Sequence, residues 1–175
     1  GTLAFKQTNI ASITIPASVT SIGEGAFESC TTLTSITIPA SVQIIGKEAF
    51  YYATNLTSVT FAAGSGRLTI GEGAFQNSGL TSIAIPASVT TMENLAFQTA
   101  SDLVSVTFAA GINLTYIKNN TFQYTGITSI EIPASVTDIG QHSLSNNSNL
   151  TSVTFAAGSG LTQIQANALA ETAIT

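Results

Sequence analysis

Two side chains in this sequence have the chemistry of a nucleophile and a general base. They are Cys30 and His142, the only cysteine and the only histidine of the chain. A thiol is activated for covalent catalysis when an imidazole lies within hydrogen-bonding distance of it. A single cysteine also excludes an intrachain disulfide framework and a zinc site built from several thiolates. Whether Cys30 and His142 can meet therefore decides whether catalysis is to be expected.

Charged residues at equivalent positions along the chain are a second candidate. Glu24, Lys47 and Glu72 recur in this way, and carboxylates that come together could hold a divalent cation. The lysine between the two acids opposes cation binding. Alternating charges on neighbouring turns of the chain instead stabilise a surface by roughly 0.5 kcal/mol each. No metal and no cofactor are therefore expected.

The composition narrows the class of protein. The 175 residues carry 4 Lys plus Arg against 9 Asp plus Glu, a net charge of −5, and 44% hydrophobic residues. No basic cluster is present to bind nucleic acid or an anionic membrane, and no stretch approaches the ~18 consecutive apolar residues of a membrane span. So few charges with this hydrophobic content argue against intrinsic disorder. One domain is expected, without nucleic-acid partners and without membrane insertion.

An internal repeat predicts the secondary structure that positions Cys30, His142 and the charged residues. The segment LTSITIP or a close variant begins at Ile10, Leu33, Leu56, Leu80, Leu103, Ile127, Leu150 and Ile174, at intervals of 23 or 24 residues. Apolar and polar positions alternate in it, as in a strand with one buried face. A later segment such as GEGAFESC is too short for an independent helix and indicates a helical or 3-10 turn. One coil cannot bury enough apolar surface to fold alone, so the coils must stack.

The repeat divides the chain, taken as a single solenoid over residues 1–175, into seven full coils and a partial coil at each end. The full coils are 10–32, 33–55, 56–79, 80–102, 103–126, 127–149 and 150–173, and the partial coils are 1–9 and 174–175. Neither end has the polar cap that solenoids need. We therefore expect a fragment of a longer protein, with end-to-end self-association through uncapped coils as an alternative. Cys30 and His142 fall in the first and sixth coils, about 25 Å apart at the ~4.8 Å spacing of strands, so the chain is predicted not to be an enzyme.

The recurring unit LTSITIPASVTSIGEGAFESC resembles the repeat of BspA-like surface proteins, also called Treponema pallidum-type leucine-rich repeats, over essentially the whole chain. The resemblance implies a leucine-rich-repeat solenoid, a β-rich α/β fold with a parallel sheet on the concave face and short helical or 3-10 turns and short strands on the convex side. It also implies a secreted or cell-surface protein that adheres to a host matrix or cell-surface protein, to a glycan, or to another microbe. The chain departs from the pattern at Arg67, which stands where Leu161 is found in the equivalent coil. A local backbone irregularity is expected there, with Arg67 pointing outward.

The outward positions of the predicted strands are the candidate binding residues. They form two columns of small hydroxyl side chains, interrupted by Ala84 and by one acidic residue: Ser12, Thr14, Ser35, Thr37, Ser58, Thr60, Ser82, Ser105, Thr107, Ser129, Glu131, Ser152 and Thr154. Many weak hydrogen bonds across such a face would recognise a protein or glycan through multivalency. Two alternatives stay open. The face belongs to a structural spacer that projects another domain, or, more remotely, it orders water as an ice-binding surface.

Tyrosines are the second candidate contact. Tyr51, Tyr52 and Tyr124 follow the phenylalanine of the AF turn, on the side away from the predicted sheet. Aromatic side chains are the usual anchors of protein interfaces, so these three residues are a candidate aromatic patch. Packing over the convex turns is the alternative.

Overall fold

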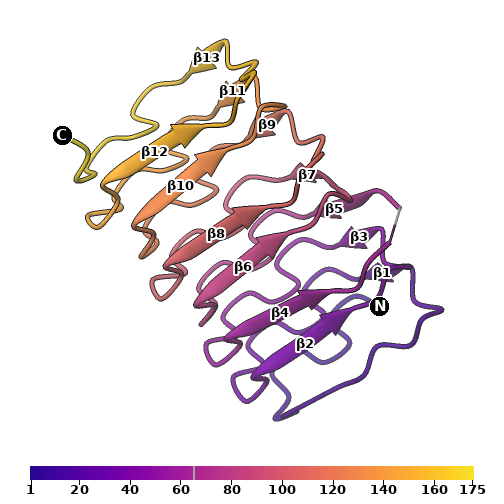
Figure 1. Ribbon diagram of the computed structural model, residues 1–175. Coiled ribbons are helices and arrows are strands. Elements are labelled where there is room, and N and C mark those ends of the chain that lie inside the picture. The colour runs from indigo at the N-terminus through magenta and orange to yellow at the C-terminus, as the bar shows by residue number, and fades with distance from the viewer. Residues whose placement is uncertain (65) are drawn as a thin grey trace.

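The chain winds into a parallel β-solenoid in which successive coils stack on one another (Figure 1). The computed structural model describes residues 1–64 and 66–175. Six coils each contribute one strand of four residues to a front line: β2 (Ser35–Ile38), β4 (Ser58–Phe61), β6 (Ser82–Ile85), β8 (Ser105–Phe108), β10 (Ser129–Ile132) and β12 (Ser152–Phe155). Strands of two to four residues form a second line behind it: β1 (Ser21–Ile22), β3 (Ile44–Ile45), β5 (Leu68–Ile70), β7 (Val89–Met92), β9 (Tyr116–Ile117), β11 (Asp138–Ile139) and β13 (Gln163–Ile164).

The strands of both lines pair in parallel. In front, β2 pairs with β4, β6 with β8 and β10 with β12, and the opening serines face each other, as Ser35 and Ser58 do. Behind, the strands form the sheets β1-β3-β5-β7 and β13-β11-β9. Parallel pairing follows from the winding, because each coil returns the chain to the same side in the same direction. The predicted solenoid, with a parallel sheet and short strands on the opposite side, is confirmed.

The prediction of helical or 3-10 turns around the Ala-Phe pair of each coil, such as Ala26–Phe27, is wrong. Residues 1–64 and 66–175 contain neither kind of helix. Alternate amides explain the difference. The Phe27 N–H donates to the Ala49 carbonyl of the next coil at 2.7 Å, whereas the Ala26 N–H donates locally to the Gly23 carbonyl at 3.2 Å. An α-helix needs each amide for the carbonyl four residues earlier. Amides that join neighbouring coils are not available for a helix.

Left-handed backbone completes these turns at two positions in each coil. Gly25 and Gly73 fill the first position in two coils. The second position is filled by residues that carry a side chain, with φ of 56–59°: Gln7, Ser29, Tyr52, Asn77, Thr99, Tyr124, Asn146 and Glu171. For such residues the left-handed region costs roughly 1–2 kcal/mol, less for asparagine and most for a β-branched side chain. Thr99 is the β-branched member of the column and is therefore its most strained residue.

We expect Thr99→Asn to stabilise the protein by about 1 kcal/mol, because asparagine enters the left-handed region more readily than threonine. The threonine hydroxyl bonds to the adjacent Gln98 carbonyl at 2.6 Å, a local contact whose loss costs little. The gain corresponds to a rise in Tm of roughly 2–4 °C for a chain of this size, measured by circular dichroism. Asn77→Thr, the reverse change in the same column, should lower Tm by a similar amount. If neither variant moves Tm, backbone strain does not govern this position.

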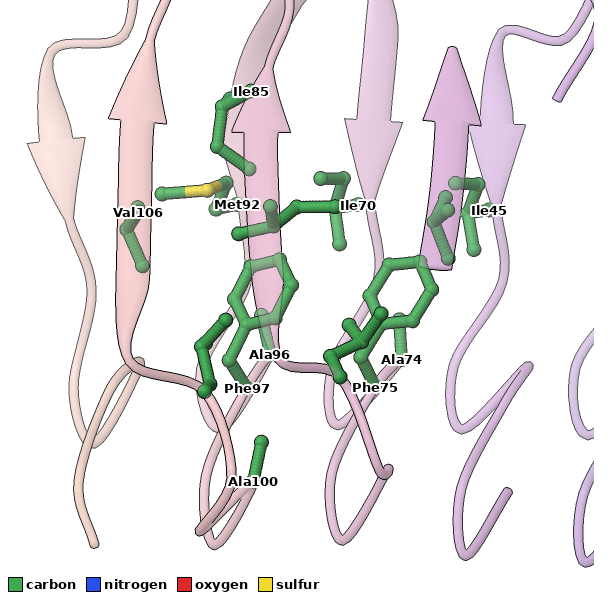
Figure 2. Packing of buried hydrophobic residues seen from close by; sticks show 14 of the residues in the cluster. Ile45, Ile70, Ala74, Phe75, Ile85, Met92, Ala96, Phe97, Ala100 and Val106 are labelled. Carbon is green, nitrogen blue, oxygen red and sulfur yellow. The ribbon is translucent and has the colours of Figure 1, made fainter. Parts of the chain in front are cut away.

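A ladder of stacked phenylalanines runs through the interior. The rings of Phe5, Phe27, Phe50, Phe75, Phe97 and Phe122 lie 5.1–5.3 Å apart in neighbouring coils, with interplanar angles of 2–9°. Figure 2 shows Phe75 and Phe97 with the buried column that contains Ile70 and Met92. Leu144 occupies the phenylalanine position in the sixth coil and is fully buried. The apolar columns of the repeat thus make one continuous core.

The third coil contains the predicted irregularity. The pairing of β5 with β7 shifts register between Leu68 and Thr69, and Arg67 is exposed. Arg67 therefore points outward beside a bulge, as expected from the displaced leucine.

The strand predicted in the first coil is not formed. Residues 12–15 make no backbone hydrogen bonds to β2 in the part of the chain that the structure describes. Ile13 and Ile15 are only half-buried, and they line a cavity of about 240 Å³ together with Phe5 and Phe27. The segment gains too little burial to close onto the sheet.

Candidate binding surface

The outward side chains of the front strands form one exposed surface, here called the strand face. Its exposed residues are Ser35, Thr37, Ser58, Thr60, Ser82, Ala84, Ser105, Thr107, Ser129, Glu131, Ser152 and Thr154. They alternate with buried side chains because successive strand residues point to opposite sides of the sheet. The front line consists of three two-stranded sheets, and within each of them pairing in register sets the opening serines side by side and the residues two positions later side by side. The stacking of the coils continues these two columns from one pair of strands to the next.

Two of the candidate residues do not belong to this surface. Ser12 and Thr14 are exposed, but the first coil contributes no front strand, so neither residue stands in register with β2. Ile13 and Ile15, the isoleucines of the same segment, are only half-buried. The segment therefore gains too little burial to pair with β2. The strand face therefore begins at Ser35.

The carboxyl ends of the front strands carry a second feature, which the sequence analysis missed. Ile38, Ile85 and Ile132 are at most 1% exposed. In the alternate coils the same position holds Phe61 and Phe108, which are half-buried, and Phe155, which is 42% exposed. The sequence signal was the alternation of the IPASV and FAAG segments, which recurs every 47 residues. The alternation of apolar and polar positions predicts that all of these side chains lie on the buried face of the strand, and the larger phenylalanines extend out of the core.

Two adjoining hollows lie beside these phenylalanines and together form what we call the strand-end groove. One hollow, of about 340 Å³, lies over Ala84, Ile85 and Pro86, with Phe61 on one side and Phe108 on the other. The other, of about 550 Å³, shares Phe108 with the first and is also lined by Glu131 and Pro133. The first hollow exists where alanine interrupts the second column of the strand face. The residues that line the groove run from residues 59–61 of β4 to Ala156, which follows β12. Figure 1 shows these front strands side by side.

The three candidate tyrosines lie on the turns rather than near the sheet. Tyr51 and Tyr52 touch edge to face, with ring centroids 5.1 Å apart. Tyr52 and Tyr124 are both about half exposed, at 46% and 49%, and occupy the same left-handed position three coils apart, roughly 15 Å at the strand spacing. The turn surface therefore brings Tyr51 and Tyr52 together and places Tyr124 separately in the same column.

Cys30 and His142 do not share a site. The Cys30 thiol is fully buried and donates to the Phe5 carbonyl at 2.9 Å. His142 lies in the turn of another coil, where its Nδ1 is 3.5 Å from the buried Ser145 hydroxyl. That hydroxyl also donates to the His142 carbonyl at 3.2 Å. These are contacts within a turn, and no substrate could reach the serine oxygen.

Each of the three lysines pairs with a carboxylate away from the strand face. Lys47 lies 3.1 Å from Glu72, and a hydrogen bond and the charge of Glu72, followed by the charge of Glu48, raise the pKa of Lys47. Lys118 pairs with Glu93 at 2.6 Å. Of the three charges at equivalent positions, Lys47 and Glu72 thus form an ion pair, and Glu24 forms none with Lys47 among the described residues. On the strand face of the described chain, Glu131 is the only charged residue.

Among residues 1–64 and 66–175, no group of three or more His, Cys, Asp or Glu side chains is arranged to hold a metal ion. The same residues include no helix of the length and hydrophobicity that crossing a bilayer requires.

Comparisons with known proteins agree with this architecture. Two overlapping matches to the model of the BspA type leucine rich repeat region, which has six copies, cover residues 1–109 and 68–175. The pneumococcal vaccine antigen PcpA is similar in structure, with 28% sequence identity and a TM-score of 0.62, over 73% of this chain and 31% of that one. A leucine rich cell surface protein from Faecalibacterium prausnitzii is 25% identical with a TM-score of 0.54, over 87% of this chain and 55% of that one.

A third solved structure shares the fold alone. The leucine rich repeat protein of T. pallidum is 16% identical, with a TM-score of 0.53 over 88% of this chain and 72% of that one. No curated protein sequence matches the chain significantly. The chain spans about a third of PcpA and about half of the F. prausnitzii protein.

Proposed function

This chain belongs to the BspA-type leucine-rich-repeat family, and from that premise we propose that it is a non-catalytic interaction module of a secreted or cell-surface protein. Its role is adhesion, and its partner is a host matrix or cell-surface protein, a glycan, or the surface of another microbe. The description of a similar structure as a cell surface protein supports this location. The chain matches only part of the similar proteins, so the proposal concerns the repeat region itself.

One observation carries the proposal. Six front strands hold their outward side chains, most of them hydroxyls, exposed in two columns that are in register within each pair of strands. Paired strands on stacked coils fix the spacing of these groups, so many weak hydrogen bonds act together without a large ordering cost in the protein.

Surface plasmon resonance tests the proposal, with the chain immobilised and fibronectin, fibrinogen and host-cell glycans as analytes. We expect Ser82→Arg with Ser105→Arg to weaken binding about tenfold or more, because two bulky cations in the middle of the serine column block a flat partner. Ser148→Arg, at an exposed turn position, is the matched control and should leave binding unchanged. Absence of binding to every analyte at about 100 μM, a free energy weaker than roughly −5.5 kcal/mol, would contradict the proposal.

A structural spacer is the second candidate, favoured by the uniform stacking of the coils at 5.1–5.3 Å along the phenylalanine ladder. A spacer would keep the adhesion of its parent protein when the strand face is substituted. Ice binding is the remote alternative, and Ala84 and Glu131 count against it because they interrupt one of the two hydroxyl columns. Thermal hysteresis measures it directly.

A further inference from the structure

We propose that the strand-end groove binds a polyproline II segment that carries basic residues. The inference rests on the proposed function, since it supplies a partner for a module whose role is binding. It concerns the carboxyl ends of the front strands and part of the second column of the strand face, whereas the column of opening serines stays outside the groove.

The spacing of the groove is the first argument. Phe61 and Phe108 stand two coils apart, and the ladder phenylalanines of the same coils lie 5.3 Å apart from each coil to the next, so two coils advance roughly 10–11 Å. A polyproline II helix has three residues per turn and advances about 9 Å per turn, so side chains on one side recur at nearly this interval. An extended β-strand repeats its side chains every ~6.7 Å and would fall out of step with the two rings. The rings therefore match the period of a polyproline II ligand.

The chemistry of the lining is the second argument. The first hollow has Ala84, Ile85 and Pro86 beneath it and a phenylalanine on each side. Proline-rich segments dock in aromatic-lined grooves, and their preformed helix loses little entropy on binding. Proline has no amide N–H, so such a ligand leaves few buried donors without partners. The polar side chains that line the first hollow are Thr60 and Thr107. So few polar side chains suit such a ligand better than a sugar, whose hydroxyls need many partners.

Charge is the third argument. Glu131 is exposed, lines the larger hollow and makes no ion pair among the described residues. A carboxylate at the side of an apolar groove is complementary to a lysine or arginine of the ligand. The net charge of −5 favours the same kind of partner. A peptide that spans the groove from β4 to β12 crosses four strand spacings, roughly 19 Å, which about six residues of polyproline II cover.

Fluorescence anisotropy with a labelled twelve-residue peptide that repeats Pro-Pro-Arg tests the proposal. We expect saturable binding that Ala84→Gln weakens about tenfold, because the longer side chain fills the first hollow. Glu131→Gln should weaken it two- to fivefold at low salt and by less at about 1 M salt, where surface charges are screened. Thr37→Gln makes the same kind of change in the same column on β2, outside the groove, and should have no effect. Circular dichroism confirms that each variant is folded.

Three results would overturn the groove assignment. They are no binding of the peptide, binding that Ala84→Gln leaves unchanged, and equal binding of a Gly-Ser-Arg repeat, which has the charge but not the helix. Binding of cellohexaose in place of the peptide, with the same sensitivity to Ala84→Gln, would make the groove a glycan site. In each case adhesion that depends on Ser82 and Ser105 would survive, so failure of this inference is distinguishable from failure of the proposed function.

Discussion

Phe75→Ala should lower the free energy of unfolding by about 3–5 kcal/mol. The Phe75 side chain is fully buried near the middle of the ladder, with Phe50 at 5.1 Å and Phe97 at 5.3 Å. Its removal leaves a cavity and takes stacking contacts from both neighbours. Coils of a solenoid are stabilised mainly by adjacent coils, so the loss falls on two interfaces at once. Urea denaturation followed by circular dichroism measures the change in free energy.

Phe75→Leu is the matched control for this prediction. Leucine already occupies the same column at Leu144, where it is fully buried. It keeps most of the volume, so we expect a loss of about 1–1.5 kcal/mol. If alanine cost no more than leucine, the coils would be closing over the gap, and the ladder would not determine their stacking.

Asn147→Ala should destabilise the protein by about 3 kcal/mol, because it leaves several buried polar groups without partners. The Asn147 side-chain oxygen accepts from the Thr125 N–H at 2.7 Å and from the Thr125 hydroxyl at 3.0 Å. The side-chain nitrogen donates to the carbonyls of Phe122 at 2.9 Å and Leu144 at 2.8 Å. The residue is fully buried, so water cannot replace these bonds. Thermal and urea unfolding both report the loss.

Asn149→Ala is the control, since Asn149 is exposed in the same coil and should change stability by less than about 0.5 kcal/mol. Asn147→Asp separates hydrogen bonding from volume. A carboxylate of the same size cannot donate to the two carbonyls and would be a buried charge, so it should be at least as harmful as alanine. A harmless aspartate would show that the position is accessible to water.

Asn147 shows what the sequence can predict about a residue and what it cannot. It is equivalent to Cys30, and the repeat identifies both as interior positions after the AF turn. Their hydrogen bonds follow from different chemistry. The thiol contacts the Phe5 carbonyl and the Thr8 hydroxyl of the previous coil, whereas the Asn147 amide bridges two coils. The period gives the place of a residue in the coil, but the bonds depend on which carbonyls the neighbouring coil presents.

The candidate binding surface was likewise predictable only in part. The strand positions from Ser35 to Thr154 were predictable because alternation in a strand decides which side chains point outward. The failure of the first coil to form its strand was not, since Ser12 and Thr14 have the same local sequence as their counterparts and differ only in how the segment packs. The strand-end groove was missed because a phenylalanine in an apolar column is indistinguishable from a core residue until the depth of that column is known.

The sequence by itself determined the winding of the chain, its parallel strands, its interior columns and its family, because a period of 23 or 24 residues leaves stacking as the means to bury the apolar positions. Only the tertiary structure decided that the AF segments are left-handed turns rather than helical ones, that the first coil stays open, and that Phe61 and Phe108 border a groove. The physical reason is that these features depend on contacts between coils. Amides shared with the next coil, burial from both sides and the space left by a neighbouring alanine are all set by residues more than twenty positions away.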